Sequence, residues 1–275
     1  LPSFGVLRYV GTKAHPAMLF PTTSHIVATA HCSFRNGGRW WRVCNAYGSL
    51  RDAVLFAKRS KAVFWRGLPT GSDFGVQTWR FNQRVRLVRE FGRREGYDVG
   101  FNRGVKKFAT QHGREVEAEV RREWVERDSV DKERHLNYAH LVHVDGNTAS
   151  WGISHKLNTG SVLFWVESDH DYREFFYALL QPWRHYVPIA PDMSDLDAAR
   201  VWAWKHPRDA EAIARRASAL LDNRMRAQDL WCYVVRLLKS MARAQTRGPS
   251  LDADVLRTYM PRGIFESFEV VEKSW

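Results

Sequence analysis

The chain has 275 residues, of which 44% are hydrophobic and 26% are charged, and this composition excludes an intrinsically disordered protein. No apolar run approaches the roughly 20 residues of a membrane-spanning helix, and the length suits one large domain or two modest ones. The formal net charge of +12 is consistent with a solvated basic surface or with an anionic partner: a nucleotide, a phosphorylated sugar, a nucleic acid or a membrane surface.

The first half of the chain begins with loop-rich sequence and then alternates between strand and helix patterns. Residues 1–55 are rich in turn-forming residues and do not make a closed unit on their own. "KAVFWRG" at residues 61–67 is short, apolar and aromatic and ends in glycine, which predicts a buried strand. The sequence then predicts an imperfect amphipathic helix over residues 76–93, a strand over residues 96–101 and a charged helix over residues 114–134. The mixed signs of that last helix argue against a DNA-binding arm.

The middle of the chain predicts three strands separated by two helices. A strand lies within residues 138–146 and a short helix follows over residues 148–157. "SVLFWVE" at residues 161–167 is a continuous apolar run, as expected for a strand that is buried on both faces. A helix is predicted over residues 171–180, and "HYVPI" at residues 185–189 predicts another strand.

The last third of the chain is predicted to be helical. Helices are expected over residues 192–206, 207–223 and 226–245, with Pro207 in the first turn of the second. Short apolar strands that alternate with helices indicate an α/β fold with a parallel sheet. Such sheets bind ligands where the carboxyl ends of their strands enter loops, which here are the loops at residues 67–71, 146–150 and 168–171.

Cysteine and histidine spacing predicts no metal centre. A bridge between Cys32 and Cys44 is possible in an oxidising compartment, Cys232 is left over, and no two cysteines have the CxxC spacing of a zinc site. His140 and His143 have a spacing that suits a metal on a helix, but a strand places them on opposite faces. We therefore expect no metal cofactor.

Two loops have the chemistry of an anion site. "WRGLPTG" places Arg66, Gly67 and Gly71 directly after a strand, which suits a phosphate or a sugar diphosphate but equally suits an ordinary turn. "DGNTAS" places amides and hydroxyls at the start of a short helix, capped by Thr148 or Ser150, which attracts anions or simply caps the helix. Neither loop has the Walker or the GxGxxG pattern.

Four further side chains are candidates for contact with a ligand. Lys156 lies near the end of the short helix and faces either the cleft or solvent. His185, beside Tyr186, is suited to hydrogen bonding or acid–base chemistry, although a histidine among apolar neighbours is more often structural. Glu174 is able to accept hydrogen bonds from a ribose diol, although an exposed helical glutamate is the more common case.

The succession of these segments resembles glycosyltransferase family 90, which includes the Rumi-type protein O-glucosyltransferases and the fungal capsule-associated xylosyltransferases. The resemblance is carried by "VFWRGLPTG", "QRVRLV", "HVDGNTASWGISHKLNTGSVLFWVES", "EFFYALLQPWRHYVPIAPDMSDL", "DAEAIARRA" and "DLWCYVVRLL". It extends over about two thirds of the chain, with a looser likeness in "LPSFGVLRY…HPAMLFP".

The resemblance implies a GT-B fold, in which two Rossmann-like domains face each other across a cleft. It implies a remnant of the acceptor-side domain at residues 1–57, a Rossmann-like UDP-sugar-binding domain at residues 58–243 and a tail at residues 244–275. The implied activity is transfer of glucose or xylose from a UDP-sugar to a protein or glycan hydroxyl, with inversion and without an obligatory metal. The implied compartment is the lumen of the endoplasmic reticulum or Golgi apparatus.

The resemblance also assigns donor-binding residues. Those that match the family's positions are Arg66, Gly67, Thr70, Gly71, Arg84, Ser150, Ser154, Lys156, Glu174, His185 and Tyr186. Arg66 and Lys156 would offset the charge that develops on the departing UDP, and Glu174 would bind the ribose.

Two departures from the family's pattern leave alternatives open. Gly152 and Ile153 stand where Rumi-type members carry an arginine, and Lys156 is a candidate replacement. The family's inverting base is an aspartate upstream of the segment with which this chain begins, so the catalytic residue is unknown, and neither Asp73 nor Asp145 is assigned to that role. The alternative function is a nucleotide-sugar-binding module without catalysis. An RNA-binding α/β protein rests on charge alone, and we expect no nucleic-acid partner.

Overall fold

The computed structural model describes residues 7–8, 18–19, 21, 51, 54–71, 75–103 and 116–244. The chain divides into two compact units, Leu1–Leu230 and Trp231–Trp275. In the second unit the described residues belong to helix α10 (Ala227–Ala244), which begins in the first unit. The domain boundaries expected from the sequence stay a prediction, because most of residues 1–57 and all of residues 245–275 lie outside the described part.

A parallel sheet of six strands forms the first unit, in the order β5-β4-β3-β6-β7-β8. The strands are β3 (Ser60–Gly67), β4 (Tyr97–Asn102), β5 (Glu126–Arg127), β6 (Tyr138–His143), β7 (Val162–Val166) and β8 (Val187–Ile189). From β3 the chain builds outward to β5, then returns to place β6 on the other side of β3 and continues to β8. The strand order therefore reverses between β3 and β6, and doubly wound sheets bind their ligands at this point. A separate pair, β1 (Leu7–Arg8) and β2 (Met18–Leu19), is also parallel.

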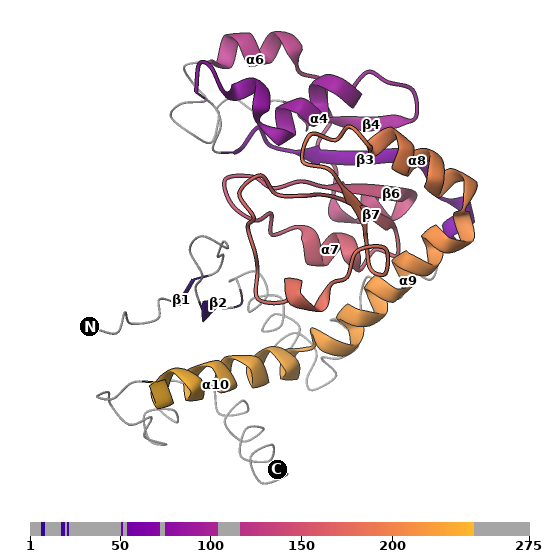
Figure 1. Ribbon diagram of the computed structural model, residues 1–275. Helices are drawn as coiled ribbons and strands as arrows, with labels where there is room; N and C mark the ends of the chain where they lie inside the picture. Colours follow the sequence, from indigo (N-terminus) through magenta and orange to yellow (C-terminus); the bar gives the residue numbers. More distant parts are fainter. Residues whose placement is uncertain are drawn as a thin grey trace. The chain divides into compact units, whose positions relative to one another are not determined.

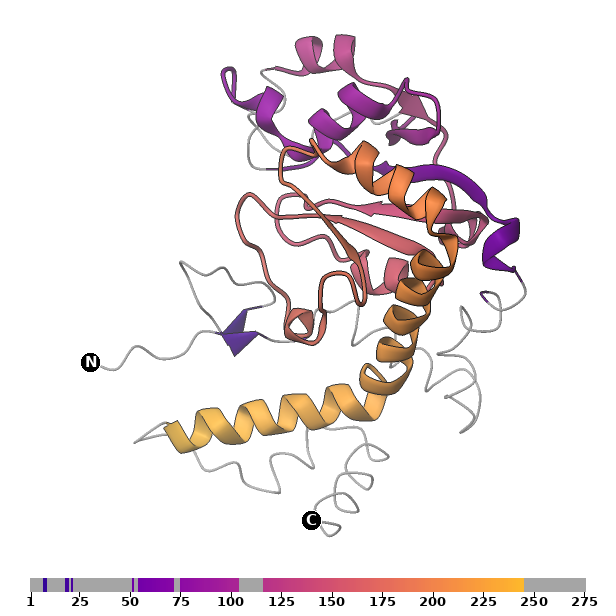
Figure 2. The same cartoon turned by 45° about the vertical axis from the view of Figure 1, so that its right-hand side comes forward.

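Helices cover both faces of the sheet (Figures 1 and 2). Helices α4 (Gln83–Phe91) and α8 (Leu196–Lys205) pack against one face, and α7 (Ile153–Leu157) packs against the other. Helix α9 (Pro207–Arg224) contributes its first half to one layer and its second half to the other.

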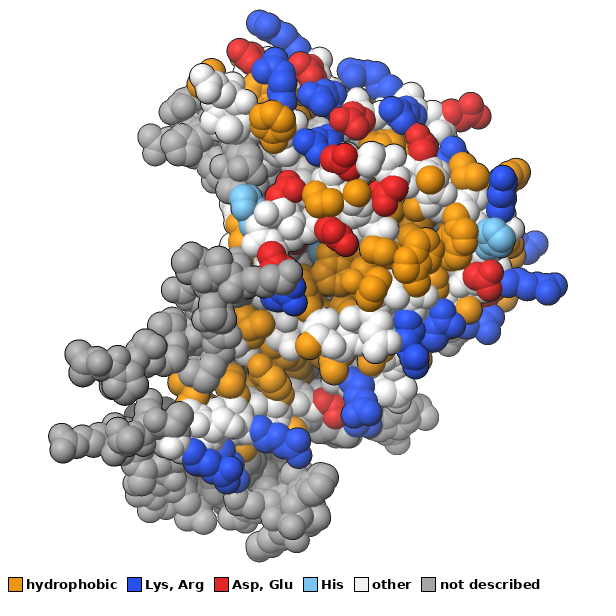
Figure 3. Space-filling model, in the orientation of Figure 1, with side chains coloured by type: hydrophobic (Ala, Val, Ile, Leu, Met, Phe, Trp, Pro, Cys, Tyr) orange, Lys and Arg blue, Asp and Glu red, His pale blue; other side chains and the backbone are white. Residues whose placement is uncertain are grey.

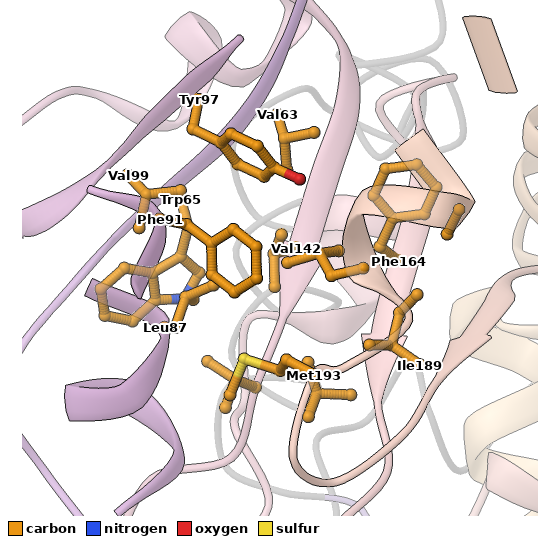
Figure 4. Packing of buried hydrophobic residues seen from close by; sticks show 14 of the residues in the cluster. Val63, Trp65, Leu87, Phe91, Tyr97, Val99, Val142, Phe164, Ile189 and Met193 are labelled. Carbon is orange, nitrogen blue, oxygen red and sulfur yellow. The ribbon is translucent and has the colours of Figure 1, made fainter. Parts of the chain in front are cut away.

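The alternation of side chains along β3 explains why its apolar run is continuous. Val63 and Trp65 point into the layer with α4, whereas Phe64 points into the layer with α7. Figure 4 shows the first layer, in which Leu87 and Phe91 of α4 fill the same buried space as Val63 and Trp65. Burial on both faces makes an α/β parallel sheet, and the predicted Rossmann-like α/β fold is confirmed.

Two helices expected in the first half of the chain are shorter in the structure than the sequence predicts. The helix expected over residues 76–93 is a 3-10 turn, η2 (Trp79–Phe81), followed by α4, because the Asn82 side chain accepts hydrogen bonds from the amides of Arg84 and Val85 and starts a new helix there. The charged helix over residues 114–134 is only α6 (Glu117–Glu123), since the buried Trp124 is extended and leads into β5; a 3-10 helix, η3 (Lys132–Asn137), follows.

Two more predicted helices differ from the structure, and both lie near the carboxyl ends of the strands. The helix expected over residues 148–157 begins only at Ile153, and its N-cap is Gly152 rather than Thr148 or Ser150. The helix expected over residues 171–180 is wrong: only the 3-10 turn η4 (Tyr177–Leu179) forms. Glu174 and Phe176 are both buried, and a helix cannot place residues two apart on one side.

Cys32 and Cys44 lie outside the described residues, and Cys232 is not in a disulfide. Within the described ranges no helix is long and apolar enough to cross a bilayer. In the same ranges no group of three or more His, Cys, Asp or Glu side chains is arranged to hold a metal ion.

Candidate functional site

The loops that follow β3 and β6 meet at the carboxyl edge of the sheet, where the strand order reverses. The amide of Gly71 donates a 2.7 Å hydrogen bond to Oδ1 of Asn147, which joins the two loops directly. A small hollow of about 20 Å³, partly open to solvent, lies beside this contact. Its lining residues are Gly71, Asn82, Gln83, Asp145, Gly146, Asp169 and His170.

Arg84 ties the two loops together from its place in the first turn of α4. Its Nε donates to the carbonyl of Asp145 at 2.7 Å, and its Nη1 donates to the carbonyl of Leu68 and to the hydroxyl of Thr70. Burial lowers the pKa of the guanidinium to about 10, and the nearby Asp145 opposes that shift. Arg84 and Thr70 therefore hold the shape of the edge, and Arg84 adds a buried positive charge to it.

The close approach of the loops requires glycine at two positions. A Cβ at Gly146 would lie 2.7 Å from Oγ1 of Thr70 and 2.9 Å from Nη2 of Arg84. Gly71 has a φ of 144°, and a Cβ there would lie 2.0 Å from the side-chain nitrogen of Asn82. The glycines of "LPTG" and "DGN" thus act through sterics, because they let the backbones of both loops approach.

Lys156 is the buried cation of the site. It lies on α7, its side chain is 8% exposed, and Nζ donates a 2.8 Å hydrogen bond to the carbonyl of Val142 on β6. Burial, reinforced by the charge of Arg84, lowers the pKa of Lys156 to about 7. Among the described residues no carboxylate forms an ion pair with it, so its ammonium form is buried without a counter-charge.

Two acidic groups of the same edge, Glu174 and Asp145, have raised pKa values. Burial raises the pKa of Glu174 to about 8, and the charge of Asp145 adds to the effect. Burial likewise raises the pKa of Asp145, against the opposing hydrogen bonds from Ser168 and from the Ser150 amide. Burial at this site therefore disfavours the charged forms of both acidic and basic side chains.

An aromatic wall, made of His143, Trp165, Tyr177 and Tyr186, backs these groups. Trp165 lies edge-on to His143 at 5.5 Å and to Tyr177 at 4.8 Å, and Tyr186 packs on it at 4.6 Å. His143 is fully buried with Nε2 3.9 Å from Oδ1 of Asp145, and burial holds its pKa well below 6.5. Sequence reasoning weighed His143 only as a metal ligand and did not propose Trp165 or Tyr177. The signal available for His143 and Trp165 was their place near strand ends in "HVDG" and "FWVE".

The structure brings most of the predicted donor-binding residues to one edge. Those that meet there through the contacts above are Thr70, Gly71, Arg84, Ser150, Lys156 and Glu174. Tyr186 precedes β8, and its ring packs on Trp165 of β7. The Ser150 amide is used within its own loop, where it donates to Asp145 at 3.2 Å. Ser154 is half-buried on α7, and Gly67 ends β3, where a Cβ would meet the ring of Trp65 at 2.6 Å.

Two predicted residues are directed elsewhere. The guanidinium of Arg66 turns along the sheet to β4, where it donates to the carbonyl of Asp98 at 2.7 Å and pairs with that residue's carboxylate. His185 lies in the turn before β8, at the opposite end of that strand from the ligand edge, and its Nδ1 accepts a 3.0 Å hydrogen bond from the Gln181 amide. The structure therefore shows a pairing role for Arg66 and a turn-forming role for His185.

The doubly wound parallel sheet defines a Rossmann-like α/β domain, and the buried Lys156 lies close to the point where its strand order reverses. Residues 2–260 match the model of Glycosyl transferase family 90, and the chain belongs to this family. The predicted family is confirmed.

Similar proteins have been characterised in animals. Human Protein O-glucosyltransferase 3 is 31% identical over 116 residues, which are 42% of this chain and 22% of that protein. Rat (Rattus norvegicus) Protein O-glucosyltransferase 1 is 34% identical over 104 residues, 38% of this chain and 26% of that protein. The matched segments thus span about a quarter of the length of these relatives. The crystal structure of Anabaena Alr3699/HepE in complex with UDP-glucose aligns with 72% of this chain and 52% of its own at 10% identity, with a TM-score of 0.42.

Proposed function

We propose that the chain binds a UDP-sugar at the carboxyl edge of its sheet and belongs to an enzyme that transfers glucose or xylose to a protein or glycan hydroxyl. Membership of family 90 and the O-glucosyltransferase relatives support this proposal. The observation that carries it is Lys156, a buried ammonium without a carboxylate partner among the described residues, at the reversal point of the sheet. A buried charge of this kind is stabilised by an anion that brings the missing counter-charge.

In the proposed reaction the acceptor oxygen attacks the anomeric carbon from the face opposite UDP. The bond from that carbon to the β-phosphate oxygen breaks, the configuration inverts, and the acceptor's proton passes to a base that is not assigned here. Negative charge develops on the departing diphosphate, and Lys156 together with the buried Arg84 would stabilise it. This positive charge is protein-derived, so we propose no metal requirement.

Glu174 and the aromatic wall would receive the nucleoside. Glu174 is buried beside Asp145, and its carboxyl is suited to the ribose diol as an acceptor or, when protonated, as a donor. Trp165 and Tyr186, whose rings pack at an interplanar angle of 51°, would help to exclude water from the edge. Exclusion of water favours transfer to the acceptor over hydrolysis of the donor. The secretory compartment expected from the resemblance rests on family membership alone.

Calorimetry of the chain with UDP, UDP-glucose and UDP-xylose tests donor binding, and UDP release with an acceptor protein tests transfer. We expect UDP binding that weakens at least tenfold in Lys156→Met, because a charge-assisted contact to the diphosphate is lost. Lys132→Met is the matched control, since Lys132 is an exposed lysine of η3. Absence of UDP binding would overturn the proposal, and binding without transfer would identify a nucleotide-sugar-binding module.

A further inference from the structure

Helix α8 carries large apolar side chains that are exposed, in addition to those that it buries. Leu196, Ala199 and Ala203 are buried against the sheet layer, yet the outer side carries Val201, which is 37% exposed, and Trp204, which is 61% exposed. These two residues are three positions apart and so share one stripe of the helix. Large exposed apolar side chains that gather on one stripe of a helix mark an interaction surface.

The turn before β8 extends this apolar surface. Trp183 is 51% exposed and packs edge-on against Trp202 of α8 at 5.1 Å. Its backbone has a φ of 60°, a left-handed conformation that bulky residues rarely adopt. The turn is fixed by a 2.7 Å hydrogen bond from the Trp183 amide to the carbonyl of Tyr186. We call Trp183, Val201, Trp202 and Trp204 the tryptophan face.

Basic side chains border the tryptophan face. Exposed cations next to it in the sequence are Arg184, Lys205 and Arg208, and the side chain of Arg216 donates to the carbonyl of Arg184. Figure 3 shows hydrophobic side chains gathered over α8 and the turn into α9, with Lys and Arg side chains along the border.

The acidic neighbours of the face do not neutralise these cations. Asp197 is bound by Arg94 and by the hydroxyl of Tyr97, and Asp209 lies 3.9 Å from His206. Among the described residues no carboxylate forms an ion pair with Lys205 or Arg208. The border is therefore a source of uncompensated positive charge.

We propose that the tryptophan face docks the protein onto the surface of an anionic lipid bilayer. Tryptophan prefers the interface between headgroups and acyl chains, where its ring is apolar and its N–H remains wet. Lysine and arginine around such a face are attracted by anionic headgroups. The charge complementarity selects an anionic surface over an uncharged one, and the face lies on α8 and the amino end of β8, away from the carboxyl edge that binds the donor.

Co-sedimentation of the 275-residue chain with vesicles tests the proposal. We expect binding to phosphatidylcholine vesicles containing about one third phosphatidylserine, weaker binding to phosphatidylcholine alone, and release by high salt. The double variant Trp183→Ala/Trp204→Ala should weaken binding at least tenfold. The double variant Lys205→Ala/Arg208→Ala should weaken it about fivefold for each charge removed.

Matched controls lie outside the face. Trp151 is an exposed tryptophan on the loop after β6, and Arg122 is an exposed arginine on α6, so Trp151→Ala and Arg122→Ala should bind vesicles as the parent does. Circular dichroism establishes that each variant is folded. Absence of binding to anionic vesicles, or equal binding by the face variants, overturns the proposal. Self-association that the Trp183→Ala/Trp204→Ala variant abolishes also overturns it, because the face then joins two copies of the chain.

Discussion

Replacing Lys156 with methionine separates the stability of the fold from the function of the site. The lysine side chain is buried on α7, and its Nζ hydrogen-bonds to the carbonyl of Val142. Methionine is apolar and similar in length, so it fills the same space without a charge. In the folded protein burial lowers the pKa of Lys156 from 10.5 to about 7.

The size of the effect follows from proton linkage. The unfolded chain binds the lysine proton more tightly than the folded one, so stability rises with pH between about pH 7 and pH 10.5 and is lowest below pH 7. Each tenfold change in proton affinity is worth about 1.4 kcal/mol, which places the cost of the ammonium at about 4 kcal/mol at pH 7. Loss of the hydrogen bond to Val142 offsets about 1 kcal/mol. We expect Lys156→Met to be about 3 kcal/mol more stable than the parent at pH 7, and the difference to vanish near pH 10.

Urea denaturation at several pH values between about 7 and 10 measures this difference. Lys132→Met is the control, and as an exposed substitution it should change the free energy of unfolding by less than about 0.5 kcal/mol. Equal or lower stability of Lys156→Met at pH 7 would refute the argument, because the ammonium would then be compensated in the folded state. The same variant should lose UDP affinity, which is the trade-off between stability and activity expected of a binding site.

Three further predictions concern residues at the carboxyl edge of the sheet. Calorimetry of UDP binding at about pH 8 in buffers of different ionisation enthalpy should show uptake of close to one proton, because the diphosphate raises the pKa of Lys156 from about 7. Gly146→Ala should lower the free energy of unfolding by about 1–3 kcal/mol through its clash with Thr70, whereas Gly152→Ala, whose nearest neighbour is 4.0 Å away, should change it little. Because the pKa of Glu174 in the folded protein is raised to about 8, the parent should lose stability as the pH rises from about 4.5 to 8. Glu174→Gln should abolish this loss, and thermal unfolding at several pH values measures the difference.

The sheet was predictable because local sequence determines it. "KAVFWRG" and "SVLFWVE" are apolar on both alternating sets of positions, and only a strand covered on both faces buries them all, as β3 and β7 are. Helix ends were less predictable, since they depend on contacts made elsewhere. The helix expected over residues 171–180 fails because Glu174 turns inward beside Asp145, a residue that belongs to a different strand's loop.

The sequence motif around Arg66 predicted where the residue lies but not where its side chain points. The residue lies at the end of β3, as "WRG" indicates, but β3 pairs with β4 in a register that places Arg66 opposite Gly100. The Asp98 carboxylate on the same strand, β4, pairs with the guanidinium. Asp98 is 32 residues away along the chain, and no local pattern around Arg66 signals that partner.

Burial, rather than motif position, identifies the cation that is left for a diphosphate. Arg66 has a carboxylate and Arg84 is committed to loop carbonyls, whereas Lys156 is inside the protein with one carbonyl and no described counter-ion. The same burial that depresses the pKa of Lys156 strengthens the attraction of its ammonium form to a bound anion. Burial beside Asp145 likewise raises the pKa of Glu174, so the edge holds a second group whose charged form is costly.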